Sequence, residues 1–290
     1  MKRWNASFLG KRQSVAPAFV PSGVFNLNSQ GVFASVGQWG GLGNINIRPM
    51  LWLDASDSST LFNASVKGST PAANGAVGRW EDKSGFGNHL AQVTANNRPL
   101  RRTAQYNGLD ILDFDGSNDS FNTYLQWFNF ATNNSYSSFV VGIADTVRTN
   151  NAVSYLNDGF WGEAGGWTAC FLRSNNTFGA YNDPNAATTA YTAGALGLFG
   201  VELSGGSIRV RLNGGSESAT ATGNTNASAT GTLLIGRTYG AYLDGKIGEI
   251  VFFDSALSAA NRQRMEGYLA HKWGLSANIP NDHPYKNSAP

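Results

Sequence analysis

The chain has 290 residues, a length that encloses one large hydrophobic core or two small ones. Charged residues make up only 14% of it and glycine occurs 35 times, a composition typical of many turns between strands rather than of a helical protein. The net charge of +2 is too small to predict nucleic-acid binding by the whole chain, and no run reaches the roughly 18 apolar residues of a membrane-spanning helix. The single cysteine, Cys170, excludes an internal disulfide.

Residues 1–49 differ from the rest of the chain in charge and in periodicity. They contain five basic residues, no acidic residue and no sustained alternation of apolar and polar positions. They also carry more large aromatic side chains than an indifferent linker does. We therefore predict an extended basic N-terminal arm that docks on another protein, burying its rings against an acidic surface. The predicted docking residues are Trp4, Phe8, Lys11, Arg12, Phe19, Phe25, Phe33 and Trp39.

Residues 50–290 form the second predicted unit, which is rich in strand signals. Its clearest alternation places Ile208, Val210 and Leu212 on one face of a strand. Asn213 and Gly214 follow, and they predict a hairpin turn because both residue types tolerate positive φ. The other predicted strands cover residues 50–54, 136–144, 167–173, 177–182, 196–203, 217–222 and 233–236.

The stretch after residue 244 predicts a strand followed by a helix. Residues 245–253 are apolar on both faces, as in a strand covered on both sides, with Ile247 and Glu249 on the same face. Ser258 is placed to cap a helix, because its hydroxyl can accept from the free amides of the first turn. Gly274 is placed to end that helix, where a left-handed residue is needed.

This helix carries one apolar stripe. Met265, Leu269 and Trp273 recur at steps of four residues, which places them on one face and predicts that this face packs against the sheet. Arg262, Glu266 and Lys272 lie off this stripe, and we expect their side chains to face water.

These segments resemble one known family. GKIGEIVFFDSALSAANRQRMEGYLAHKWGL (Gly245–Leu275) is similar to the closing strand and helix of concanavalin A-like (laminin-G-like) lectin and glucanase domains. LWLDASDSSTLF, GRWEDKSGFGNHLAQ and LDFDGSNDS, at residues 51–62, 78–92 and 112–120, resemble the opening strands of that family. The resemblance implies an all-β fold, a two-sheet antiparallel jelly-roll sandwich with one short C-terminal helix. The family serves many functions, so the resemblance does not decide which one applies.

The arm carries a second resemblance. SGVFNLNSQGVFASVGQW (Ser22–Trp39) is similar to a short element of structural proteins of tailed bacteriophages, although Phe25 stands where that element has Trp and Gly40 where it has Pro. The resemblance implies a non-enzymatic virion structural protein, a capsid decoration, neck or tail component assembled in the bacterial cytoplasm. Its implied partners are other virion proteins, including copies of itself, with no membrane span.

A glycan-binding adhesion module that recognises host-surface carbohydrate is the alternative function. Sugars stack on aromatic rings beside polar side chains, and two predicted loops offer such rings; the same rings would otherwise plug the ends of the sandwich. The candidate glycan-binding residues are Phe160, Trp161, Trp167, Tyr239 and Tyr242.

A glycoside hydrolase is a further alternative, and it needs paired carboxylates. Glu249 and Asp254 have the outer spacing of the glucanase motif, but Val251 occupies its middle position. An unbulged strand also points residues five apart to opposite faces.

Calcium is the only cofactor for which the sequence offers candidate ligands. Hard oxygen ligands on loops are what Ca²⁺ selects, although the spacing here is not that of an EF-hand. The candidates are Asp54, Asp82, Asp115 and Asp119.

Overall fold

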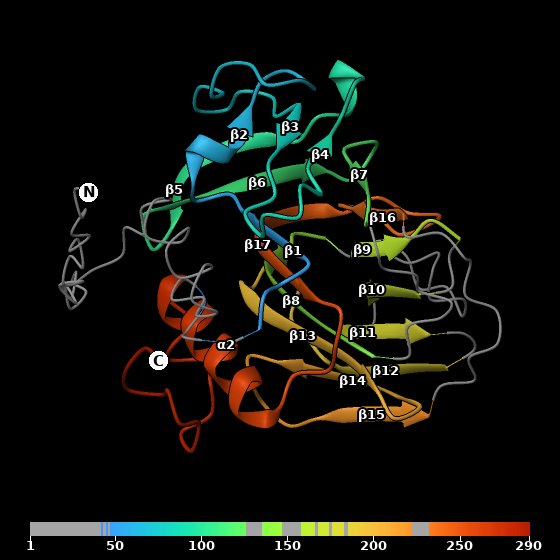
Figure 1. The fold of residues 1–290 in the computed structure, drawn as a ribbon, viewed down its shortest axis with the longest axis vertical. Coiled ribbons are helices and arrows are strands. Elements are labelled where there is room, and N and C mark those ends of the chain that lie inside the picture. Colours follow the sequence, from blue (N-terminus) through green and yellow to red (C-terminus); the bar gives the residue numbers. More distant parts are fainter. Residues whose placement is uncertain are drawn as a thin grey trace, which may run out of the picture.

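The computed structural model describes residues 42, 45, 47–125, 135–146, 158–165, 168–173, 176–182, 185–221 and 232–290. The predicted docking residues from Trp4 to Trp39 lie outside these ranges, and so does Trp167, a candidate glycan-binding residue. Within them the chain forms two antiparallel sheets and one α-helix (Figure 1). The predicted all-β sandwich with a single C-terminal helix is therefore confirmed. No helix in the described ranges is long and apolar enough to cross a membrane.

The first sheet has eight strands among the described residues. Across the sheet they run β15 (Ser218–Ala221), β14 (Ser207–Leu212), β13 (Gly197–Ser204), β8 (Tyr136–Ala144), β17 (Asp244–Phe253), β6 (Leu109–Asp115) and β5 (Leu100–Tyr106). The eighth strand, β1 (Leu51–Asp54), pairs with the C-terminal half of β17, past the last residue that pairs with β6. Strands from opposite ends of the described chain therefore meet at the centre of this sheet.

The second sheet has nine strands within the described ranges. Across the sheet they run β12 (Asn185–Ala190), β11 (Thr177–Asn182), β10 (Thr168–Arg173), β9 (Gly159–Glu163), β16 (Thr232–Ile235), β7 (Phe121–Tyr124), β4 (Leu90–Ala91), β3 (Arg79–Trp80) and β2 (Leu61–Phe62). Two short 3₁₀ helices, η1 (Ser58–Thr60) and η2 (Ala95–Asn97), lie in the connections near its β2–β4 end.

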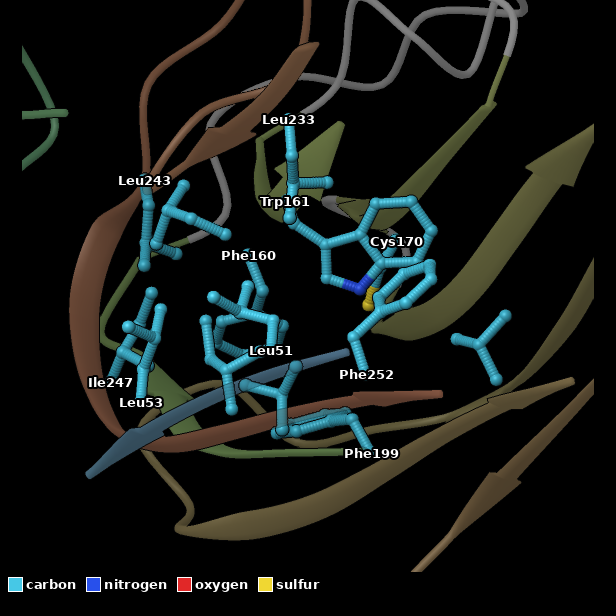
Figure 2. Packing of buried hydrophobic residues seen from close by; sticks show 14 of the residues in the cluster. Leu51, Leu53, Phe160, Trp161, Cys170, Phe199, Leu233, Leu243, Ile247 and Phe252 are labelled. Carbon is cyan, nitrogen blue, oxygen red and sulfur yellow. The ribbon is translucent and has the colours of Figure 1, made fainter. Parts of the chain in front are cut away.

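Apolar side chains from both sheets fill the space between them and form the first core. Figure 2 shows Leu51, Phe199 and Phe252 from the eight-stranded sheet together with Trp161 and Leu233 from the nine-stranded sheet. The rings of Trp161 and Phe252 meet edge to face with their centroids 5.7 Å apart, a favoured arrangement for aromatic pairs. Burial of these large side chains is the main stabilising contribution to the sandwich.

The helix α2 (Ala259–Lys272) covers the other face of the eight-stranded sheet and forms the second core with it (Figure 1). The predicted stripe of Met265, Leu269 and Trp273 is buried there, as expected. The Ser258 hydroxyl accepts from the amide of Asn261 at 3.3 Å, which confirms the predicted cap. Gly274 has φ +74°, which confirms the predicted left-handed end.

The second core also includes residues on the N-terminal side of the predicted domain boundary at residue 50. Leu42 and Ile45 are fully buried against the residues of this core. The last part of the predicted arm therefore packs on the sandwich of its own chain. The docking role of the remaining arm stays a prediction.

A β-bulge in β17 positions the polar side chains described below. The pairing of β17 with β8 shifts register between Ile247 and Glu249, so Gly248 is an extra residue in the strand. Ile247 points into the first core and Glu249 to the helix side, so the prediction that they share a face is wrong. Gly248 is required because a Cβ there would lie 2.5 Å from the ring of Trp273.

Candidate functional site

The first polar cluster lies beneath α2 and is centred on the fully buried carboxylate of Glu249. The indole N–H groups of Trp52 and Trp273 each donate to it at 2.8 Å. Lys272 Nζ donates at 2.6 Å and the Tyr268 hydroxyl at 3.3 Å. Both oxygens of this carboxylate are therefore occupied by donors from β1 and α2.

Lys272 connects Glu249 to a second buried carboxylate. Its Nζ lies 2.9 Å from Asp54 Oδ1, and Lys83 Nζ lies 2.9 Å from Asp54 Oδ2. We call Asp54, Lys83, Glu249 and Lys272 the buried charge network. Burial alone would raise the pKa of Asp54, but the two lysines outweigh it and hold that pKa below its usual range. For Glu249, burial raises the pKa against the opposing effect of Lys272.

The buried charge network brings two carboxylates together but leaves a substrate no access to them. Asp54 and Glu249 contact the same Nζ atom, so the two carboxylates lie near each other, as the pair of a retaining glycosidase does. Glu249 has no exposed surface, however, and a glycosidic bond cannot reach it. The predicted pair of Glu249 and Asp254 does not form either, because Asp254 is exposed where β17 ends. The role of the network is therefore structural: it joins α2 to the eight-stranded sheet.

Of the three helix residues predicted to face water, Arg262 is half-buried, and the predictions for Glu266 and Lys272 are wrong. Glu266 is only 2% exposed because the C-terminal tail covers it, with His283 Nε2 3.3 Å from its carboxylate. Lys272 is drawn inward by the carboxylates of Asp54 and Glu249. In both cases the partner lies in a part of the chain distant from the residue in sequence.

The four predicted glycan-binding aromatic residues that the structure describes do not form one site. Phe160 and Trp161 are fully buried in the first core, so the prediction that they lie on a loop is wrong: they belong to β9 (Figure 2). Tyr239 is 52% exposed. Tyr242 is half-buried beneath the guanidinium of Arg237, which lies 4.9 Å from its ring centroid. Tyr239 is thus the most exposed of the described candidates.

The four predicted calcium ligands do not converge on a common point. Asp54 binds lysines, and Asp82 accepts from backbone amides that include Trp52 N at 3.0 Å. Asp115 accepts from the amides of its own turn, and Asp119 accepts from Asp115 N at 3.1 Å. Burial and the neighbouring charge of Asp115 raise the pKa of Asp119 to about 6. In the described part of the chain no three His, Cys, Asp or Glu residues are arranged to hold a metal ion.

The second polar cluster is an open cup of about 300 Å³ at one end of the sandwich. It lies where β12 ends, β13 begins and β14 turns, with one wall from the tail after α2. Its polar lining consists of neutral side chains and its apolar lining of small or branched ones. We call it the amide cup, defined by Asn176, Thr192, Leu196, Leu212, Asn213 and Asn278.

The asparagine side chains of the cup are largely free of protein partners. Asn213 Oδ1 accepts from Leu198 N at 2.8 Å, which leaves its Nδ2 group open. Asn176 and Asn278 are exposed, and their side-chain amides bond to no residue in the described ranges. The sequence analysis missed all three as ligand-binding residues, because asparagine in a turn predicts only backbone conformation.

Tyr191 fixes the back wall of the cup by two hydrogen bonds of its hydroxyl. Its ring is 4% exposed, and its hydroxyl donates to Ala195 O at 2.8 Å and accepts from Ala144 N at 3.0 Å. Burial raises the pKa of Tyr191 to about 12, so the hydroxyl remains a donor at neutral pH. The segment that carries Thr192 and Leu196 is therefore tied to β8.

Comparison with known proteins identifies the fold. No protein-family model matches the chain, and no curated protein matches it. The Trypanosoma rangeli sialidase in complex with sialic acid is similar at 14% identity with a TM-score of 0.51. An arabinofuranosidase complexed with arabinofuranosyl-α-1,2-xylobiose is similar at 12% identity with a TM-score of 0.55, and a GH54 α-L-arabinofuranosidase soaked with a cyclic sulfate inhibitor at 12% with 0.54.

These matches cover most of this chain but only part of the other proteins. The similarity covers 76% of this chain and 32% of the sialidase, and 84% of this chain and 65% of each arabinofuranosidase. At such identities the comparison establishes a shared β-sandwich and nothing of the ligand.

The comparison also corrects the predicted function. A non-enzymatic virion structural protein was predicted, but the similar solved structures named above are glycosidases. The predictions of a virion structural role and of a chain without enzymatic activity are therefore wrong. The predicted localisation in a virion and the predicted protein partners are not tested.

Proposed function

We propose that this chain is a concanavalin A-like sandwich domain that binds carbohydrate in the amide cup. One observation carries the proposal: Asn176 and Asn278, whose side-chain amides bond to no described residue, line a cup whose back wall is fixed by Tyr191. A sugar hydroxyl both donates and accepts hydrogen bonds, and an asparagine amide offers two donors and one acceptor. Unpaired groups of this kind on a rigid wall gain bonds when a sugar binds without reorganising the protein.

The size and the lining of the cup also support binding. Its volume of about 300 Å³ is at the lower end of the range for small-molecule sites. Leu196 and Leu212 supply an apolar wall against which the C–H groups of a sugar ring can pack. Most glycosidases use two carboxylates, and the described lining of the cup includes no Asp or Glu, so we assign it a binding role.

The proposal is tested by titrating a panel of mono- and oligosaccharides into the whole chain by calorimetry. We expect Asn176→Gly and Asn278→Ala each to weaken binding about tenfold, because each removes one or two hydrogen bonds of about 1 kcal/mol. Glycine is the right replacement at residue 176, since its φ of +58° is left-handed.

Matched controls lie outside the cup. Asn74→Gly alters another left-handed asparagine, with φ +60°, and Asn281→Ala alters another exposed asparagine of the tail. Both controls should bind as tightly as the unmodified chain. Unchanged binding after both cup substitutions, or no binding by the unmodified chain to any sugar in the panel, would show that the proposal is wrong.

A further inference from the structure

We propose that the amide cup selects uncharged sugars and discriminates against uronic and sialic acids. This inference rests on the proposed function and adds the class of ligand. Every hydrogen-bonding side chain in the described lining of the cup is neutral: three asparagines, one threonine and the buried tyrosine behind them. A carboxylate is recognised by cationic donors, above all by the fork of an arginine, and the described lining residues include no Arg, Lys or His.

Charged side chains behind the turn at Asn213 are already paired. Gly214, next to the lining residue Asn213, lies close to Glu266 and His283, whose carboxylate and imidazole are 3.3 Å apart. Arg262 Nη1 lies 3.9 Å from the same Glu266 carboxylate. On the tail side, Lys286 Nζ donates to the carbonyls of Ala277 and Ile279, on either side of Asn278, at 2.9 and 2.7 Å, so backbone carbonyls hold this ammonium.

Arg211 adjoins the lining residue Leu212 but is also paired. It forms an ion pair with Glu217. Neighbouring side chains of a strand point to opposite faces, so Arg211 and Leu212 face different sides of β14. An anionic sugar in the cup would therefore lose water from its carboxylate without gaining an ionic partner, which disfavours its binding.

The lining also predicts the form of the neutral ligand. The cup is small and Tyr191, the one aromatic residue in its described lining, is buried, so it offers no open ring on which a long sugar chain could stack. A terminal sugar unit or a short oligosaccharide fits this geometry better than the interior of a polymer. Because no charge is involved, we expect binding to be insensitive to salt.

The experiment compares sugars that differ only in charge. Glucose, galactose and mannose are each titrated against the corresponding uronic acid, glucuronate, galacturonate or mannuronate, at 20 mM and 500 mM NaCl, with the whole chain. We expect at least one neutral sugar to bind at least ten times more tightly than its uronate, with less than a twofold change between the two salt concentrations. Asn278→Lys should narrow or reverse that preference at low salt, whereas Asn281→Lys, outside the cup, should not.

The outcomes separate this inference from the proposed function. Uronates that bind as tightly as the neutral sugars, and lose binding in Asn176→Gly and Asn278→Ala, would overturn the neutral selectivity while the carbohydrate site survives. Neutral binding that falls more than tenfold between 20 mM and 500 mM NaCl would also overturn it. If neither class binds, both the selectivity and the proposed function are wrong.

Discussion

The buried charge network and the amide cup both gather polar side chains from segments that are distant in sequence. They differ in hydrogen bonding: the side chains of the network bond to one another, whereas those of the cup have few protein partners. Glu249 accepts four hydrogen bonds and has no exposed surface. Asn278 is exposed and its amide bonds to no described residue. Polar groups that the fold encloses must be paired, because an unpaired buried group costs free energy. Polar groups that remain open and unpaired on a rigid wall are available to a ligand.

The largest expected effect is the removal of the central carboxylate of the network. Glu249→Ala leaves the ammonium of Lys272 with fewer partners and removes the carboxylate to which two buried indoles donate. We expect the free energy of unfolding to fall by about 3–5 kcal/mol. Urea denaturation followed by circular dichroism measures this loss. The control Glu217→Ala removes an exposed ion pair and should change it by less than about 1 kcal/mol; equal losses would remove the distinction between the two kinds of cluster.

A smaller loss of stability is expected when a side chain is added at Gly248, in the β-bulge that orients Glu249. Gly248→Ala places a Cβ 2.5 Å from the rigid ring of Trp273, which also holds Glu249. Overpacking of this kind costs about 1–3 kcal/mol. Gly200→Ala, in β13, is the matched control because its Cβ would meet ordinary contacts of 3.5 Å or more. Unfolding midpoints in urea that shift alike for the two variants would contradict the proposed close approach.

The network should also make the free energy of unfolding dependent on pH. The pKa of Asp54 is lower in the folded chain than its ordinary value of 3.8, so its contribution is complete above about pH 4 and is lost as pH falls. Asp119 has the opposite sign, since its raised pKa contributes stability that is lost as pH rises from 3.8 to about 6.

Comparing Asp54→Asn with the unmodified chain isolates the first of these contributions, because Asp119 is present in both. We expect the variant to be less stable by about 1–3 kcal/mol at pH 7, and the difference to shrink at pH 2.5. Urea denaturation at the two pH values measures it. A difference that grows on acidification would contradict the assigned direction of the pKa.

The smallest effect on stability is expected in the cup. Asn278→Ala removes no hydrogen bond to a described residue and should change the free energy of unfolding by less than about 0.5 kcal/mol. Asn213→Gly keeps the left-handed backbone but loses the hydrogen bond from Leu198 N. We expect this loss to lower the free energy of unfolding by about 1 kcal/mol. Thermal unfolding of the two variants measures both changes in stability. A large loss in Asn278→Ala would mean that this amide is structural, like the network.

Local patterns predicted much of the fold because they depend on neighbours in sequence. The apolar run of β8 and the composition of β11 gave strands with the observed bounds, and the turn at Asn213 adopts the positive φ that its residue type tolerates. The same patterns failed for Phe160 and Trp161, because glycines around them suggested a loop. Those glycines instead allow close approach: a Cβ at Gly159 would lie 2.6 Å from the carbonyl of Cys170.

The sequence by itself determined the strand-rich sandwich, the capped helix α2 and its apolar stripe, since these follow from the period of side chains and from short-range caps. Only the tertiary structure decided the polar clusters. The bond between Trp52 and Glu249 joins residues 197 positions apart, and the amide cup takes its asparagines from two turns and the tail. No local period records such contacts, because they exist only once β1, β17 and the tail have been brought together by burial of the two cores.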